Sequence, residues 1–396
     1  MRYTLYGDGI HDDTDAIQEM IDSSCEAVLP APKAFYLISR TLVLHSNFRL
    51  VLPRFAEIRL APQSNCLMLK SATVDDASDR GGFKIFDYLN RYDPDAPTEN
   101  IEVTGGIWNF NNQEQNPNPL STGKYEPEGY LGLMFLFYHV KNLRISSMTL
   151  KNPANFCITL DKVSYFNVED LTFDFNDGNL YQSNMDGVHI CGNCHHGNIE
   201  KLFGTCYDDI VALNAEEGSR GPVSDIAIRG IYTEGSYSAV RLLTANPECP
   251  IRNIHISDIR GTFYHFVIGF MQYYKTEKRG RIENVTIDNV YASKSDRTVI
   301  KFPKVTKYKR YGVLDFEGKI DVKNVHISDL HRREFVDNIP TILVGTGVAI
   351  DNMILENITS ENHTDLGEMP LIRIQTERIA NIVGRELYED GKKAEL

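Results

Sequence analysis

The sequence lacks three features that would place it in large and familiar classes of protein. It contains no run of about 18 apolar residues, so no segment is predicted to span a membrane. Its 41 Lys and Arg stand against 54 Asp and Glu, and the net charge of −13 argues against a nucleic-acid partner, which needs clustered cations. It has no Pro-, Gly- or Ser-rich linker, so we expect a single domain over residues 1–396.

Cysteine is scarce, and its number is odd. Seven cysteines are spread through 396 residues, which does not fit a disulfide framework and predicts reduced, mostly buried thiols. The first residues lack the apolar stretch of a signal peptide. This favours a cytoplasmic protein, or a secreted one if a leader has been removed. Composition does not specify an oligomeric state.

One cysteine-rich segment has the spacing of a cofactor motif. Cys191-Gly192-Asn193-Cys194-His195 matches the attachment pattern of c-type haem, but no export signal accompanies it. Zinc bound by Cys191, Cys194, His195, His196 and Cys206 is the alternative, because thiolate and imidazole ligands suit zinc. We expect buried free thiols here, with no metal and no cofactor.

A short repeat runs through the chain from about residue 100. Each copy is an Asn or Asp followed by alternating apolar residues, which is the pattern of a strand. The copies begin at Asn100, Asn142, Asn167, Asn198, Asp225, Asn253, Asn284, Asn324 and Asn352. From Asn142 the steps are 25, 31, 27, 28, 31, 40 and 28 residues, and self-similarity at such periods predicts a solenoid or a propeller.

The length of the repeat favours a solenoid. Propeller blades usually need about 40 residues or more, whereas most steps here are shorter and leave room for two or three short strands. The recurring Asn tolerates turn geometry and can hydrogen-bond the matching Asn on the next coil. We therefore predict an all-β, single-stranded, right-handed parallel β-helix, with a surface loop at 113–119 and an excursion at 301–318.

Residues 1–30 are predicted to form a cap. Asp13-Thr14 precedes a short amphipathic helix in which Ala16, Ile17, Met20 and Ile21 share one face. The end of a solenoid exposes an open sheet edge, which a capping element covers.

Two acidic clusters stand at the head of apolar runs. Asn184-Met185-Asp186-Gly187 precedes the run 188–190, and Asp208-Asp209, 22 residues after Asp186, precedes the run 210–213. This spacing is about one coil, so we expect three carboxylates on neighbouring rungs, facing one groove. Crowded carboxylates are costly and keep one of their number protonated near neutral pH, as a general acid requires. The alternative is that these acids only cap turns.

These segments resemble known families. Residues 6–18, which read Tyr-Gly-Asp-Gly-Ile-His-Asp-Asp-Thr-Asp-Ala-Ile-Gln, resemble the entry segment of the pectate-lyase-like β-helix superfamily. The two acidic clusters resemble the paired Asn-x-Asp and Asp-Asp motifs of the polygalacturonases, glycoside hydrolase family 28. The resemblance implies an inverting hydrolysis in which Asp208 is the general acid, Asp186 and Asp209 activate water, and Asn184 steadies the site.

The chain departs from that family at two later rungs. Residues 235–240 replace a Gly-His-Gly motif, and residues 264–269 replace an Arg-x-Lys motif that binds the galacturonate carboxylate. Tyr237 and His265 stand at these rungs and are predicted to contact substrate. Arg241 is predicted either to bind substrate or to pair with a site carboxylate. His189 is predicted either to contact sugar or to be a satisfied structural histidine.

These features predict a glycoside hydrolase that cleaves an O-glycosidic bond in a plant or microbial oligosaccharide or polysaccharide. An α-galactoside-type sugar is expected to be preferred over polygalacturonate, because the family's anion-binding pair is missing. A polysaccharide lyase on the same fold, with Ca²⁺ held by the carboxylates and Arg241 as its base, is one alternative. A non-catalytic glycan-binding β-helix of a phage or cell surface is the other.

Overall fold

The structure is a computed structural model that describes residues 4–74, 95–115, 132–175, 184–297, 299–301, 304–306, 311–394 and 396. The chain divides into two compact units. Unit 1 holds residues 1–189, 206–208 and 299–305, and unit 2 holds residues 190–205, 209–298 and 306–396. A single domain over residues 1–396 therefore stays a prediction.

Unit 1 is built from short parallel strands that pair from one coil to the next. In its first sheet, β10 pairs along one part of its length with β7 and along another with β8, so one long strand continues two shorter ones. The strands of this sheet are β1 (Glu26–Val28), β2 (Tyr36–Ile38), β4 (Phe48–Val51), β5 (Glu57–Leu60), β7 (Thr98–Thr104), β8 (Ile107–Asn109), β10 (Val140–Lys151) and β12 (Ser164–Asp174). The second sheet pairs β3 (Leu42–Leu44), β6 (Leu69–Ser71), β9 (Phe135–Tyr138) and β11 (Ile158–Asp161).

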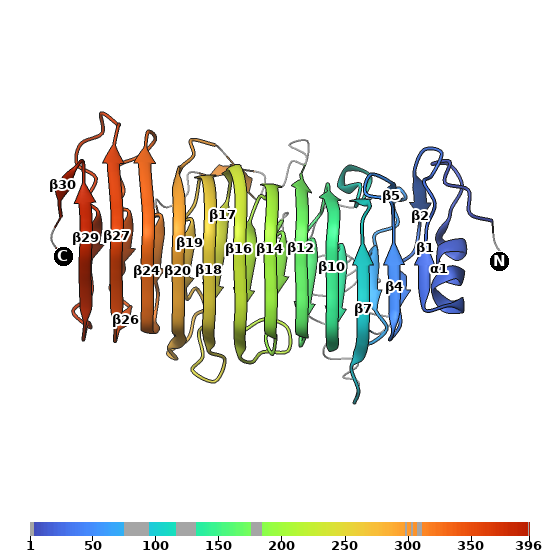
Figure 1. Cartoon of the computed structure of the whole chain (residues 1–396), viewed down its shortest axis with the longest axis horizontal. Coiled ribbons are helices and arrows are strands. Elements are labelled where there is room, and N and C mark those ends of the chain that lie inside the picture. The colour runs from blue at the N-terminus through green and yellow to red at the C-terminus, as the bar shows by residue number, and fades with distance from the viewer. Residues whose placement is uncertain are drawn as a thin grey trace. The chain divides into compact units, whose positions relative to one another are not determined.

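Unit 2 repeats this arrangement with longer strands, which lie side by side from β14 to β29 in Figure 1. Its first sheet contains β14 (His195–Thr205), β16 (Val223–Ser236), β18 (Ile251–Phe263), β20 (Gly280–Lys294), β24 (Ile320–Glu334), β26 (Ala349–Ile350), β27 (Met353–Asn362), β29 (Ile382–Glu389) and the antiparallel β30 (Lys392–Lys393). Its second sheet contains β15 (Asp209–Asn214), β17 (Ser238–Leu243), β19 (Ile268–Met271), β23 (Leu314–Glu317), β25 (Ile342–Val344) and β28 (Ile372–Ile374).

Three further strands and a turn of helix complete the described elements. They are β13 (Val188–Ile190), the two-stranded sheet of β21 (Val299–Lys301) and β22 (Lys304–Thr306), and the 3-10 helix η3 (Asn112–Glu114).

Alternating apolar residues form the core of each unit. In β20, Ile282 and Val285 are buried and pair with Val322 and Val325 of β24, so like residues stack on like from coil to coil. The predicted right-handed parallel β-helix is therefore the observed fold. All seven cysteines are free thiols, and only Cys25 is exposed. No helix of the described residues is long and apolar enough to cross a membrane.

The recurring asparagines form hydrogen-bonded ladders, as predicted. In unit 1, the Nδ2 of Asn142 donates to Asn100 at 2.8 Å, and the Nδ2 of Asn100 donates to Asn47 at 2.7 Å. In unit 2, Asn324 donates to Asn284 at 3.1 Å. The φ angles of Asn100, Asn142, Asn284 and Asn324 lie between 52° and 62°, a left-handed conformation that Asn adopts more readily than most residues.

Two copies of the predicted repeat are wrong by two residues. Lys141 pairs with Ser164 and Leu143 with Phe166, so Tyr165, with φ 57°, stands at the ladder position and not Asn167. In β14 the equivalent residue is His196, also with φ 57°, and not Asn198. The apolar alternation continues unchanged past both sites, and the Asn that follows in sequence gave a false starting point.

The N-terminal cap has the predicted helix. Helix α1 (Thr14–Ser23) contacts β1 and β3 and buries Ala16, Ile17 and Ile21. The carboxylate of Asp13 does not cap this helix and instead accepts hydrogen bonds from the backbone N–H groups of Tyr6 and Gly7. Asp13 therefore fastens the entry segment to the start of the helix.

The two predicted irregular segments are only partly described. The excursion at 301–318 is too long at its C-terminal end, because residues 314–317 form β23, which pairs with β19 at the ordinary register. The loop predicted at 113–119 begins in η3, and residues 116–119 lie outside the described residues.

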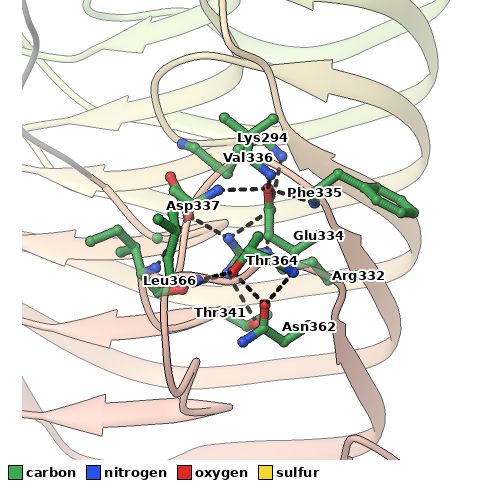
Figure 2. A network of polar contacts seen from close by, with 12 residues as sticks. Lys294, Arg332, Glu334, Phe335, Val336, Asp337, Thr341, Asn362, Thr364 and Leu366 are labelled. Carbon is green, nitrogen blue, oxygen red and sulfur yellow. Dashed lines mark hydrogen bonds and ion pairs between the residues drawn. The ribbon is translucent and has the colours of Figure 1, made fainter.

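A buried polar network lies where β20 and β24 end in unit 2 (Figure 2). Arg332 donates to Glu334 at 2.8 Å and to Asp337 at 2.9 Å, and one Glu334 oxygen accepts three backbone N–H groups from residues 335–337. The backbone N–H of Lys294 donates to the other Glu334 oxygen. The Nζ of Lys294 is buried and has no hydrogen-bond partner among the described residues. Burial lowers the pKa of Lys294 to about 8, although the nearby Asp337 opposes this shift.

This shift predicts a pH-dependent stability. The ordinary pKa of lysine is 10.5, so between about pH 8 and that value the unfolded chain binds more protons at Lys294 than the folded chain does. The free energy of unfolding of the wild type should therefore rise over this window relative to that of Lys294→Met. Urea titrations at several pH values measure the difference, with Lys323→Met, which removes a half-exposed lysine of β24, as the control. Parallel pH profiles for wild type and Lys294→Met would contradict the prediction.

Candidate active site

Asp186 is held in the interior of unit 1 by a histidine. Oδ2 of Asp186 lies 2.7 Å from Nδ1 of His189, and both side chains are fully buried. The ring of His189 stacks on Phe156 with 3.8 Å between centroids and 7° between planes. His189 thus fixes the position of the Asp186 carboxylate, which is the structural role that the sequence left open. Contact of His189 with sugar stays a prediction.

Asp208 lies beside Asp186 in the same unit. Carboxylate oxygens of the two residues lie within 4.8 Å of each other, and both residues are buried. Oδ2 of Asp208 accepts the backbone N–H of Asn184 at 3.2 Å. Asn184 has φ 55°, a left-handed conformation, and it contributes its main chain to this contact. The sequence therefore correctly predicted that Asn184, Asp186 and Asp208 meet.

Cys157 lies on the preceding coil, next to this pair. Its backbone N–H donates to the carbonyl of Asp186 at 3.0 Å. Burial, with a further contribution from the Asp186 charge, raises the pKa of the Cys157 thiol well above its ordinary value. The thiol is therefore neutral and acts as an apolar neighbour of the carboxylates.

Asp209 follows Asp208 directly, opens β15 and belongs to unit 2. Its Oδ2 forms an ion pair with Arg241 at 2.6 Å. Asp209 is fully buried and the Arg241 side chain is 17% exposed. Arg241 lies on β17, where it pairs in register with Ala212, and its side chain reaches back toward the start of β15. Of the two roles predicted for Arg241, the structure shows the pairing with a site carboxylate.

Tyr237 and His265 lie at the turns before β17 and β19. Their rings stack at 4.2 Å and 17°, and the His265 ring lies 4.1 Å from that of Tyr311. Tyr237 is 6% exposed and His265 is 5% exposed, so most of both rings is in contact with protein. Their contact with substrate stays a prediction.

Two tyrosines near Arg241 received no individual role from the sequence. Tyr273 is 44% exposed and Tyr274 is 37% exposed, and both follow β19. The hydroxyl of Tyr274 contacts Oε1 of Glu217 at 3.0 Å. Desolvation of the phenol raises the pKa of Tyr273, while Arg241 acts in the opposite direction. The only signal in the sequence was a group of aromatic residues in 262–274, most of which are ordinary core residues.

The sequence offered two alternative metal sites, zinc at the 191–196 segment and Ca²⁺ at the acidic residues. Among the described residues, Cys191, Cys194, His195 and His196 do not bring three ligand atoms together. The Nδ1 atoms of His195 and His196 are 2.6 Å apart, but no third Cys, His or carboxylate of the described chain joins them. Asp186 and Asp208 offer oxygen ligands, but Ca²⁺ takes about 6–8.

The carboxylates of Asp186 and Asp209 have different partners, a histidine and an arginine. An arginine beside a carboxylate favours its ionised form, so Arg241 stabilises the negative charge of Asp209. Asp208 precedes Asp209 in the chain, and its carboxylate approaches that of the histidine-bound Asp186. Carboxylates gathered in this way are unfavourable for stability and are typical of sites that move protons.

A comparison with sequence models of protein families gives a match over part of the chain. The sequence model of glycosyl hydrolases family 28 matches residues 97–220, which include Asn184, Asp186, Asp208 and Asp209 but neither Tyr237 nor His265. No curated protein matches the chain.

Several solved structures share the fold. Endo-xylogalacturonan hydrolase from Aspergillus tubingensis is 14% identical with a TM-score of 0.60, covering 94% of this chain and 98% of that chain. The family 28 exopolygalacturonase of Yersinia enterocolitica is 15% identical with a TM-score of 0.63. The match covers 99% of this chain and 78% of that chain. A tailspike protein of E. coli bacteriophage HK620, in complex with a hexasaccharide, is 14% identical with a TM-score of 0.61, covering 96% and 64%. The family match and the fold support a glycoside hydrolase or a glycan-binding β-helix.

The Asp209–Arg241 pair makes a prediction about stability. Replacing Arg241 by Met leaves the buried Asp209 without its cation and should lower the free energy of unfolding by about 3–5 kcal/mol. The double variant with Asp209→Asn should recover much of this loss, because the buried charge is then removed. Urea unfolding measures both, with Arg252→Met, an exposed arginine of β18, as the control. A loss no larger than that of Arg252→Met would show that the pair is not a buried ion pair.

Proposed function

We propose that this protein is a glycoside hydrolase that cleaves an O-glycosidic bond of an oligosaccharide or polysaccharide. Asp208 is its general acid, and Asp186 and Asp209 are the carboxylates that activate water. The observation that carries the proposal is the approach of the buried Asp186 and Asp208 carboxylates to within 4.8 Å. A fold gains no stability from placing two carboxylates so close, whereas glycoside hydrolysis needs such a group.

The partners of the carboxylates support these roles. Arg241 stabilises the negative charge of Asp209. The ionised carboxylate can accept a hydrogen bond from a water molecule and so orient it. His189 orients the Asp186 carboxylate. Its Nδ1 contacts that carboxylate, and its ring is held by stacking on Phe156. Asp208, whose Oδ2 accepts the backbone N–H of Asn184, is assigned the proton that the leaving group receives because it matches the general acid of the resembling family.

The family resemblance implies inversion. In most inverting enzymes the two carboxyl groups are about 6.5–9.5 Å apart, with water between them. Asp186 and Asp208 are closer than this at their nearest oxygens, so a water between these two alone has little room. We assign the activation of water to Asp186 and Asp209 on the family resemblance.

The charges of the described residues favour a neutral sugar. Arg241 is already engaged with Asp209 at 2.6 Å. A uronate carboxylate would have to displace that pair or approach the acidic group without a cation of its own, and unpaired buried charges cost several kcal/mol. A neutral α-galactoside-type sugar avoids this cost.

The role of Asp208 predicts a loss of turnover. Asp208→Asn keeps the size of the side chain but removes the proton donor, so kcat should fall by about 10²–10⁴-fold. Asp174→Asn, which alters an exposed carboxylate of unit 1, should keep the wild-type rate. Release of reducing sugar from an unactivated α-galacto-oligosaccharide, whose leaving group needs protonation, measures kcat, and circular dichroism checks the fold. Near wild-type activity of a folded Asp208→Asn would remove Asp208 from this role.

The charge argument predicts the substrate. Initial rates with p-nitrophenyl α-galactoside or an α-galacto-oligosaccharide should exceed those with polygalacturonic acid at one enzyme concentration. Activity should survive EDTA, and proton NMR should show an inverted first product. Faster release from polygalacturonic acid would contradict the preference for neutral sugars. Calcium-dependent formation of an unsaturated, ultraviolet-absorbing product would favour the lyase, and a retained anomer would overturn inversion.

A further inference from the structure

Unit 2 contains a cavity that the assigned carboxylates do not line. Its volume is about 740 Å³, within the range of about 300–1,000 Å³ that is typical of small-molecule sites. Its walls come from four successive coils. They are the turn after β19, the end of β23 with the turn that follows it, β25 with the turn after it, and Gln375 after β28.

Two glycines of the lining lie where successive turns pack closely. Gly318 has φ 89°, and a Cβ atom there would lie 2.3 Å from the carbonyl oxygen of Gln272. A Cβ at Gly347 would lie 2.6 Å from the carbonyl oxygen of Gly318. The backbones of consecutive coils approach so closely at these positions that only glycine fits, so the turns that line the cavity pack directly on one another.

Tyr273 and Tyr274 form the wall of the cavity that lies toward Arg241. Both line the cavity, and both phenols are within electrostatic range of Arg241, as the Tyr273 phenol also is of Asp209. Tyr274 is fixed in place, because its hydroxyl contacts Glu217, which in turn accepts the side-chain amide of Asn214 at 3.0 Å. A pair of exposed aromatic rings held this way presents apolar faces to a ligand.

Carboxylates outnumber lysines on the lining, where Glu277, Asp315 and Glu317 stand against Lys275 and Lys319. Lys319 is paired with Glu277 at 2.7 Å, so one of the two lysines is neutralised by a neighbour. Asp315 is buried, and Glu317 stands beyond it on the same strand. A uronate would meet these two carboxylates, whereas a neutral pyranose can present its hydroxyls to them and its C–H face to the tyrosines.

We propose that this cavity is a subsite for a neutral glycosyl residue of the substrate. The subsite rests on the proposed function for its place in the reaction, and on the tyrosines, glycines and charges of unit 2 for its chemistry. It makes the enzyme prefer a neutral oligosaccharide over a single glycoside, because the second sugar gains contacts that a small aglycone lacks.

The test compares a long with a short substrate. Tyr273→Ala and Tyr274→Ala should each lower the ratio of kcat/KM for α-galactotriose to kcat/KM for p-nitrophenyl α-galactoside by about three- to tenfold, the range expected for one aromatic contact. Tyr274→Phe, which keeps the ring, should recover most of the loss. Thr346→Trp, which narrows the cavity from another wall, should lower the same ratio. The control is Tyr388→Ala, which removes a similarly exposed tyrosine of β29 and should leave the ratio unchanged.

Failure of the subsite and failure of the proposed function give different results. If the wild type hydrolyses both substrates and the cavity variants keep the wild-type ratio, the subsite is wrong and the hydrolase stands. If no glycoside is cleaved, titration calorimetry with α-galactotriose tests the cavity alone. Binding that Tyr273→Ala and Thr346→Trp weaken supports the subsite without hydrolysis. Absence of binding, or binding that both variants retain, overturns the subsite.

Discussion

Parallel pairing of residues on successive coils is the constraint on which the rest of this structure depends. Backbone hydrogen bonds hold each strand against the equivalent strand of its neighbour, so a residue is placed beside its counterpart one coil away. Ala212 thus stands beside Arg241, and Arg241 beside Gly269. Because the register leaves no freedom to slide, a charge on one coil is paired, or left unpaired, by what the next coil offers.

This constraint makes the buried charges of the protein informative. A charge inside a β-helix needs a partner from its own or an adjacent coil, since water does not reach it. Arg332 meets this need with Glu334 and Asp337, and Asp209 meets it with Arg241. The approach of Asp186 to Asp208 is different in kind, because two acids cannot stabilise each other by charge. That contrast is the physical reason for reading the acidic group as chemistry and the arginine networks as structure.

The turns between strands carry what distinguishes this chain within its fold. The strands supply a repeating scaffold, and the side chains at the proposed site stand at strand ends or in the turns beside them. Tyr237 and His265 stack where the resembling family has a histidine and a cation pair, and Gly318 and Gly347 allow a later set of turns to pack closely. Replacement of turn residues can thus change which sugar is accepted without disturbing the strand register.

The sequence by itself determined the strand alternation, the asparagine ladders, the amphipathic cap helix and the meeting of Asn184, Asp186 and Asp208. These follow from local patterns and from a spacing of about one coil. It did not determine that Tyr165 and His196 take ladder positions, because turn lengths vary and the register is set by pairing with the neighbouring coil. Nor did it determine the stacking of His189 on Phe156 or the cavity beside Tyr273 and Tyr274. Those contacts join residues from different coils, and only the stacked tertiary structure decides which side chains then face each other.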